Sequence, residues 1–181
     1  MKILFSIRWL ILSVFLIAYI EDRKCDNMFT VSGDVYQRGV YCGGAEPDPE
    51  ELKEIEKPKA WPNKKLFIKK GKTNDLASTV LLEFTTDEKG GFSFVLPPGD
   101  YCVVDEYKVK KSNYNSLLKQ FKKPTGSYGA VDKKCLETYF KTPDLIFTVS
   151  LTDIKGLVIS YQERCSWLGP PCVEYKGSPP P

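Results

Sequence analysis

The sequence predicts a mainly β protein, a seven-stranded antiparallel β-sandwich with short helical insertions. Three observations predict this class: apolar and polar side chains alternate in seven short runs, turn-forming residues separate the runs, and 181 residues suit a single domain. Residues 86–104 show the pattern most clearly. Gly90 and Gly91 supply the positive φ of a hairpin turn, and the Pro97 to Asp100 segment turns the chain again.

The alternating runs place the strands at 29–35, 66–68, 80–84, 92–96, 101–107, 145–151 and 157–161. Seven short strands separated by turn signals are typical of two-sheet sandwiches of the transthyretin-like or immunoglobulin-like type. The sandwich domain is therefore expected to span 29–165, after a linker at 21–28. The proline-rich tail, 166–181, is expected to be irregular.

Helical insertions are expected near 49–56, 113–122 and 133–141. Each follows a residue suited to cap a helix, namely Asp48, Ser112 or Asp132, and each ends before a proline. Apolar stripes on short surface helices usually pack on their own domain. We therefore expect these helices to cover one end or one face of the sandwich.

The first 20 residues read as a secretory signal peptide. A short basic start precedes an apolar run, Trp9–Ile20, whose length fits a signal peptide better than a membrane-spanning helix. The bulky Ile20 makes a poor cleavage site and leaves an uncleaved membrane anchor as the alternative. The protein is thus expected to be exported to the periplasm or the cell surface, with membrane contact only if this segment stays uncleaved.

Composition excludes several classes of function. The formal net charge is +3 and the lysines are dispersed, so no nucleic-acid groove is predicted. The chain has no histidine, which removes Ser-His-Asp and Cys-His catalysis and every His-ligated metal site. Candidate catalytic carboxylates are Asp87, Glu88, Asp100, Asp105 and Glu106. Because acidic residues are ordinary turn formers, neither a catalytic residue nor a cofactor is predicted.

Six cysteines in an exported chain favour disulfide bonds over a zinc site, since no Cys-x-x-Cys pair is present. If seven strands alternate in direction, the first and the last run the same way, and Cys42 and Cys165 follow their ends at one pole. Cys25 and Cys102 belong to the other pole and are expected to pair. Three pairings stay open among Cys42, Cys135, Cys165 and Cys172. No free thiol is expected.

The 86–104 stretch also resembles a known family of domains. Its motif T-D-x-x-G-x-F-x-F-x-L-x-x-G-x-Y consists of Thr86, Asp87, Gly90, Phe92, Phe94, Leu96, Gly99 and Tyr101. It is similar to exported carboxypeptidase regulatory-like and transthyretin-like sandwich domains. Segments 41–45, 62–66, 70–72 and 165–181 further resemble small exported bacterial proteins of this kind. The resemblance implies a fold and a compartment and transfers no catalytic residue.

The function predicted from these observations is a non-enzymatic exported domain, a structural or ligand-presenting module of the bacterial envelope or cell surface. A binding surface is expected at the cysteine-rich pole, built from Gly43, Gly44, Trp167 and Tyr175. The alternative is a carbohydrate-binding accessory domain that uses Trp61 or Trp167. Candidate partners are an envelope protein or a glycan.

Overall fold

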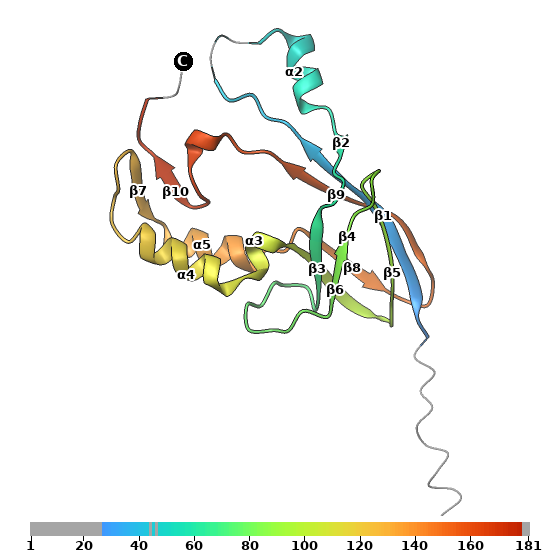
Figure 1. The fold of residues 1–181 in the computed structure, drawn as a ribbon. Coiled ribbons are helices and arrows are strands. Elements are labelled where there is room, and N and C mark those ends of the chain that lie inside the picture. Colours follow the sequence, from blue (N-terminus) through green and yellow to red (C-terminus); the bar gives the residue numbers. More distant parts are fainter. Residues whose placement is uncertain (1–26, 44, 46, 179–181) are drawn as a thin grey trace, which may run out of the picture.

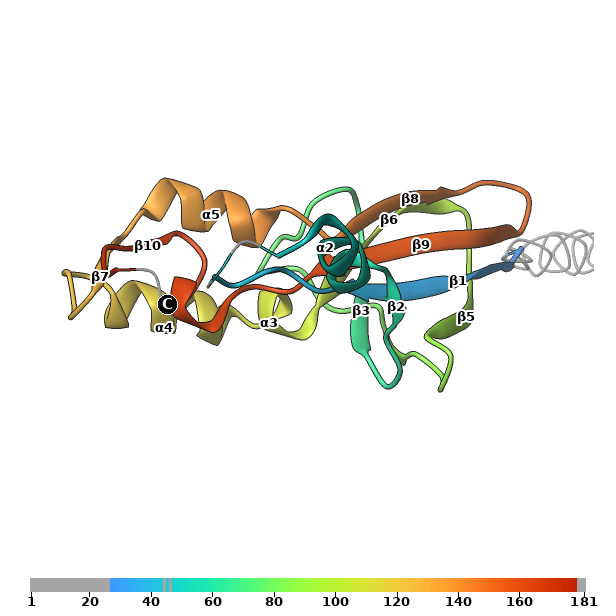
Figure 2. The same ribbon diagram turned by 90° about the horizontal axis from the view of Figure 1, so that it is seen from above.

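The computed structural model describes residues 27–43, 45 and 47–178. It consists of two packed β-sheets with a helical region at one end (Figures 1 and 2). The expected signal segment and Cys25 lie outside the described residues. Among the described residues, no helix has both the length and the apolar character needed to cross a membrane.

The first sheet is organised around its central strand, β1. Its strands are β1 (Phe29–Arg38), β2 (Lys59–Ala60), β5 (Gly91–Leu96) and β9 (Ile154–Gln162). β1 pairs antiparallel with β2 and β5, and parallel with β9. The first and last strands of the sandwich therefore run side by side in the same direction, as their alternation in the sequence predicts.

The second sheet is antiparallel throughout. Its strands, in spatial order, are β4 (Leu82–Thr85), β3 (Lys65–Lys70), β6 (Gly99–Asp105) and β8 (Leu145–Val149). Every second side chain along these strands points into the space between the sheets. Val31 and Ile159 from the first sheet pack there with Ile68, Tyr101 and Val103 from the second. All five are at most 1% exposed, so this interior is the main core.

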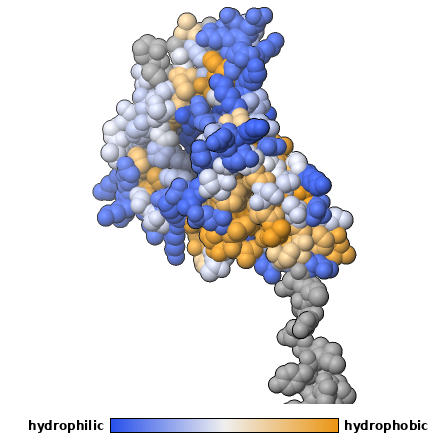
Figure 3. All heavy atoms as spheres, turned by 45° about the vertical axis from the view of Figure 1, so that its right-hand side comes forward, coloured by the Kyte–Doolittle hydropathy of each residue, from blue (hydrophilic) through white to orange (hydrophobic). Residues whose placement is uncertain are grey.

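A helical region extends one end of the sandwich. It contains α3 (Glu106–Val109), α4 (Lys111–Gln120), β7 (Tyr128–Val131), α5 (Lys133–Lys141), the 3-10 helix η1 (Ser166–Leu168) and β10 (Val173–Tyr175). A second hydrophobic cluster holds it together, formed by Leu117, Phe121, Leu136, Phe140 and Val173. The remaining helix, α2 (Pro49–Glu56), buries no side chain. In Figure 3, hydrophilic side chains cover the part of the surface around α2, while apolar ones gather over the sandwich strands.

The structure corrects the expected fold in several places. The described residues form ten strands in three sheets, with one parallel pair, rather than a purely antiparallel set of seven. The fifth expected strand ends at Asp105, because this carboxylate accepts a hydrogen bond from the Lys108 amide and starts α3. Leu151, expected in the sixth strand, lies in a turn and is 73% exposed. Only Gly90 of the Gly90–Gly91 pair has a positive φ, of 81°.

Helix predictions based on strong caps match the structure. Asp48 and Asp132 cap α2 and α5, whose bounds equal the expected ones. α4 begins at Lys111 instead of residue 113, and the Ser112 cap is wrong, since the helix has no side-chain cap. The tail is not irregular throughout, because β10 pairs with β7 and Val173 is buried against the helices.

Gly33 sets how closely β1 and β9 approach. A Cβ atom added there would lie 2.0 Å from the Leu157 carbonyl oxygen, a backbone atom that cannot turn away. We therefore expect Gly33→Ala to lower the free energy of unfolding by roughly 1–3 kcal/mol. Chemical denaturation measures this loss. Gly129→Ala is the matched control, because its Cβ would meet atoms only at 3.5 Å or more; equal stability of the two variants would contradict the prediction.

Candidate functional site

The parallel pairing of β1 and β9 creates the site at the pole where both strands end. Beyond these ends, the Glu163 amide donates a hydrogen bond to the Arg38 carbonyl, at 2.8 Å, and keeps the two segments together. Cys42 and Cys165 follow and form a disulfide bond, with their Cα atoms 5.3 Å apart. Trp167 Nε1 then donates to the Cys42 carbonyl at 2.9 Å. We call this region the disulfide pole.

A second disulfide bond, Cys135–Cys172, ties the tail to α5. Asp132 supports it from both sides: its side chain accepts from the Cys135 amide at 3.0 Å, and its own amide donates to the Cys172 carbonyl at 2.9 Å. Among the three pairings that the sequence leaves open, the structure therefore has Cys42 with Cys165 and Cys135 with Cys172.

The expected bond between Cys25 and Cys102 involves a cysteine outside the described residues, and Cys102 is not bonded to any described cysteine. It carries a free thiol, is 0% exposed and lies opposite Lys69 in the second sheet. Its Sγ contacts the Thr73 carbonyl at 3.5 Å, so the segment after β3 covers it. Burial raises the pKa of this thiol, which keeps it protonated and unreactive. The sequence predicts a place for Cys102 at the opposite pole, but this residue lies in the middle of β6 and its side chain faces a covered surface that the sequence does not indicate.

The structure brings two of the expected binding residues together. The rings of Trp167 and Tyr175 have centroids 5.4 Å apart, and Tyr128 contacts Tyr175 at the same distance. Tyr128 also donates its hydroxyl to the Trp167 carbonyl at 3.1 Å. Gly43 adjoins Cys42 at this pole, while Gly44 lies outside the described residues. These two rings of the tail thus pack on each other, and Tyr128 of β7 contacts both residues.

Trp61 lies apart from this pole. It meets Tyr161 edge to face at 5.3 Å, and Lys64 Nζ sits 4.1 Å from the centre of its indole ring. Neighbouring side chains therefore contact both of the indole rings considered for sugar stacking, those of Trp61 and Trp167, and both residues stay partly exposed.

A cavity of about 570 Å³ lies at the disulfide pole, between α5 and the tail. Tyr139, Arg164 and Pro171 line it together with the Cys135–Cys172 bond. Burial raises the pKa of Tyr139 to about 12, so its hydroxyl stays neutral at physiological pH. Sequence reasoning missed Tyr139 and Arg164. The available signals were the place of Tyr139 on the apolar stripe of its helix and the position of Arg164 next to Cys165.

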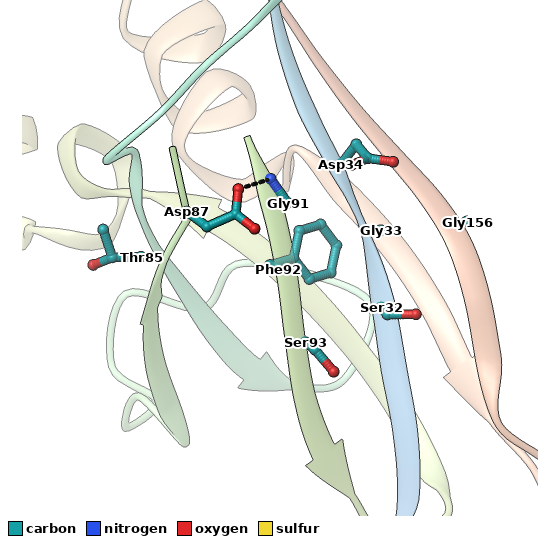
Figure 4. A pocket seen from close by; sticks show the side chains of 9 residues that line it. All are labelled: Ser32, Gly33, Asp34, Thr85, Asp87, Gly91, Phe92, Ser93 and Gly156. Atoms are coloured by element: carbon teal, nitrogen blue, oxygen red, sulfur yellow. Dashed lines mark hydrogen bonds between the residues drawn. The ribbon is translucent and has the colours of Figure 1, made fainter. Parts of the chain in front are cut away.

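A second cavity, of about 500 Å³, opens beside β1 and β5 (Figure 4). Asp34 and Asp87 both line it, but Asp87 serves the hairpin turn: its Oδ1 accepts from the amides of Lys89 and Gly91 at 2.7 and 2.8 Å. The described residues contain no group of three or more Cys, Asp or Glu side chains that could hold a metal ion. The two acids that line this cavity are thus not part of such a group.

The other carboxylates considered for catalysis, except Glu88, also have structural partners. Asp100 accepts from the Thr148 hydroxyl at 2.6 Å, which lowers its pKa, and Asp105 caps α3. Glu106 forms an ion pair with Lys110 at 2.6 Å. Asp87 closes a turn, and Glu88 is exposed next to it. Contacts within the fold therefore explain the positions of Asp87, Asp100, Asp105 and Glu106 without a bound substrate.

A buried polar network joins the sandwich to the helical region. Asp144 accepts hydrogen bonds from Lys108 Nζ at 2.7 Å, from the Tyr161 hydroxyl at 2.9 Å and from the Asp105 amide at 2.7 Å. The side chains of Asp144 and Lys108 are only 8% and 12% exposed. Burial, followed by the neighbouring Asp144 charge, raises the pKa of Tyr161. Burial is also the main cause that raises the pKa of Asp105.

The raised pKa of Asp105 predicts a pH-dependent effect of Asp105→Asn. A carboxyl group whose pKa is higher in the folded state than in the unfolded state lowers the free energy of unfolding as pH rises. This loss begins near the pKa of the unfolded state and is complete above the pKa of the folded state. The amide keeps the cap and removes the charge. We expect Asp105→Asn to raise the free energy of unfolding at pH 7 and to leave it unchanged near pH 3. Urea unfolding at both pH values checks this, with exposed Glu88→Gln as control; a loss of stability at pH 7 would contradict it.

The two disulfide bonds predict unequal losses of stability when each is removed. They span 123 and 37 residues. In the chain-entropy relation the longer loop constrains the unfolded chain more, so Cys42→Ser with Cys165→Ser should cost about 5 kcal/mol. Cys135→Ser with Cys172→Ser should cost about 4 kcal/mol. Denaturant titration of both double variants checks the order, and a larger loss for the second pair would show that strain or residual structure dominates.

Comparisons with known proteins show a distant structural similarity and no family. No protein-family model and no curated protein matches the chain. The solved structures that match include the Bacillus anthracis TIE protein (14% identity, TM-score 0.29, 75% of this chain and 17% of that one). Two others are the Lactobacillus rhamnosus GG shaft pilin SpaA (10%, 0.36, 75% and 48%) and its N-terminal domain (11%, 0.35, 74% and 92%).

These values limit what the comparisons mean. The matched part spans less than half of the first two proteins. With TM-scores of 0.29 to 0.36, the likeness is to β-sandwich domains of Gram-positive surface proteins, without a family assignment, and no argument below rests on it. The resemblance of the 86–104 stretch to carboxypeptidase regulatory-like domains stays a prediction.

Proposed function

We propose that this protein is an exported structural module that carries tension between the two ends of its chain. The observation that carries the proposal is the Cys42–Cys165 bond, which joins the ends of two parallel neighbouring strands 123 residues apart in sequence. Disulfide bonds form and persist in oxidising compartments outside the cytoplasm. The two bonds therefore agree with an extracellular protein.

The bond gives tension a short covalent route. A force applied at residue 27 and at residue 178 passes along β1 to Cys42, crosses the disulfide to Cys165 and leaves through the tail. Residues 43–164 form a closed loop beside this route and carry no covalent tension. In Figure 1, β1 begins at one end of the molecule and the C-terminal tail lies at the other, so the route runs through the whole length of the fold.

Two further contacts hold the short route in place. β1 is the central strand of its sheet, paired on both sides, which resists its removal. The tail is fixed to α5 by Cys135–Cys172 and to β7 by the pairing of β10. The packed Trp61 and Trp167 rings offer no specific support for the carbohydrate-binding alternative. Four of the five candidate carboxylates, all except the exposed Glu88, have structural partners, which supports a non-enzymatic role.

Pulling a single molecule from both ends tests the proposal. With the bond intact, extension is limited to the chain before Cys42 and after Cys165, about 100 Å for the described residues. Cys42→Ser with Cys165→Ser moves the covalent route to the Cys135–Cys172 bond, frees the chain between residues 42 and 135 and should add about 300 Å. The Cys135→Ser, Cys172→Ser variant keeps the route and serves as the control. If the unreduced protein releases the long extension, the load-bearing function is wrong.

A further inference from the structure

The Cys135–Cys172 bond forms part of the wall of the 570 Å³ cavity between α5 and the tail. Both cysteines line this cavity, where Cys135 is exposed and Cys172 is half-buried. A compound dissolved in water therefore has a way to reach the bond from the cavity. The tension route proposed above crosses Cys42–Cys165, so this second bond lies outside that route.

Positive charge exceeds negative charge around this bond. Lys134 and Arg164 line the cavity, both are exposed, and neither forms an ion pair within the part of the chain that the structure describes. The lining also contains Asp132, whose carboxylate accepts a hydrogen bond from the Cys135 amide at 3.0 Å. Cys135 lies in the first turn of α5, where the helix dipole favours negative charge. The surroundings of the bond therefore favour an anionic reactant over a cationic one.

The Cys42–Cys165 bond has less favourable surroundings for an attacking thiolate. Cys42 Sγ contacts the Val40 carbonyl oxygen at 3.6 Å, and Cys165 Sγ contacts the Tyr41 carbonyl oxygen at 3.6 Å. These oxygens carry partial negative charge, which disfavours both an approaching thiolate and a departing one. Attack on the exposed Cys42 would also expel a thiolate from Cys165, which is only 4% exposed, and burial in apolar surroundings disfavours a thiolate.

We propose that Cys135–Cys172 is a site of thiol–disulfide exchange with small anionic thiols. The thiolate of such a compound attacks Sγ of Cys135, the exposed cysteine of the pair. A new sulfur–sulfur bond forms there, the Cys135–Cys172 bond breaks, and Cys172 leaves with the electron pair as a thiolate. Lys134 and Arg164 stabilise the negative charge on the attacking and departing sulfurs.

A second thiolate completes the reaction by attacking the small-molecule sulfur of the mixed disulfide. Cys135 leaves as a thiolate, so the protein bond is reduced by two electrons and the two small thiols are oxidised to their own disulfide. The tail then loses its covalent tie to α5, and the pairing of β10 with β7 holds it in place. Cys172, whose φ of 62° is uncommon for a residue with a side chain, can then leave this conformation.

Timed reduction of the oxidised protein tests the proposal, with freed cysteines trapped by iodoacetamide and located by mass spectrometry. Anionic 2-mercaptoethanesulfonate and cationic cysteamine, both thiols with two carbons, are compared at equal thiolate concentration. We expect the sulfonate to open Cys135–Cys172 at least about tenfold faster than Cys42–Cys165 and to form its mixed disulfide on Cys135. Its advantage over cysteamine should fall as salt rises. The buried Cys102 should stay unlabelled until the protein is unfolded.

Lys134→Gln and Arg164→Gln should each slow the reaction with the sulfonate about two- to fivefold and should not slow the reaction with cysteamine. Both residues are exposed, so the variants should fold, and a loosened fold would instead speed the reaction with both thiols. Lys155→Gln, an exposed change on β9, is the matched control for the lost charge and should leave both rates unchanged.

Faster opening of Cys42–Cys165, a mixed disulfide on Cys172, or equal rates with the two thiols overturns the proposal. Undiminished reaction of both cavity variants, Lys134→Gln and Arg164→Gln, with the sulfonate overturns it as well. These outcomes leave the tension-bearing proposal untouched, because that proposal concerns the route through Cys42–Cys165 in the unreduced protein.

Discussion

The parallel pairing of β1 with β9 is the constraint on which the other features depend. It requires a glycine at position 33, where the Leu157 carbonyl leaves no space for a side chain. It also brings together two segments that are far apart in sequence, so Cys42 and Cys165 can bond without further rearrangement. The tail then starts at a fixed point, from which η1 and β10 reach the helical region.

The helical region depends on the sandwich through one buried cluster of charges. Asp144 receives donors from three elements at once, and loss of the Lys108 ammonium would leave its buried charge uncompensated. Such a cluster adds little net stability compared with apolar packing, but its hydrogen bonds can all form in only one arrangement of these elements. The orientation of α3 relative to β6 and β9 is thus specified by hydrogen bonds, while the second hydrophobic cluster supplies the packing energy.

Local signals in the sequence predict much of the structure. The predictions that fail depend on contacts with distant segments of the chain. Asp48 and Asp132 predict α2 and α5 to the residue because capping acts within one turn. Strand alternation predicts the common direction of β1 and β9, and with it the pole shared by Cys42 and Cys165. β7 and β10 are too short to show periodicity. The burial of Cys102 depends on a distant segment folding over it, and no pattern near that residue reports this.

The covered position of Cys102 has a consequence for the order of oxidative folding. Before the second sheet forms, its thiol is free to attack any of the four cysteines that end up paired, and a chain oxidised at that stage can close wrong bonds. Once β3 and β6 have paired and the segment after β3 has settled, the sulfur is out of reach of both oxidants and disulfides. Bonds that close after the sheet has assembled therefore exclude Cys102.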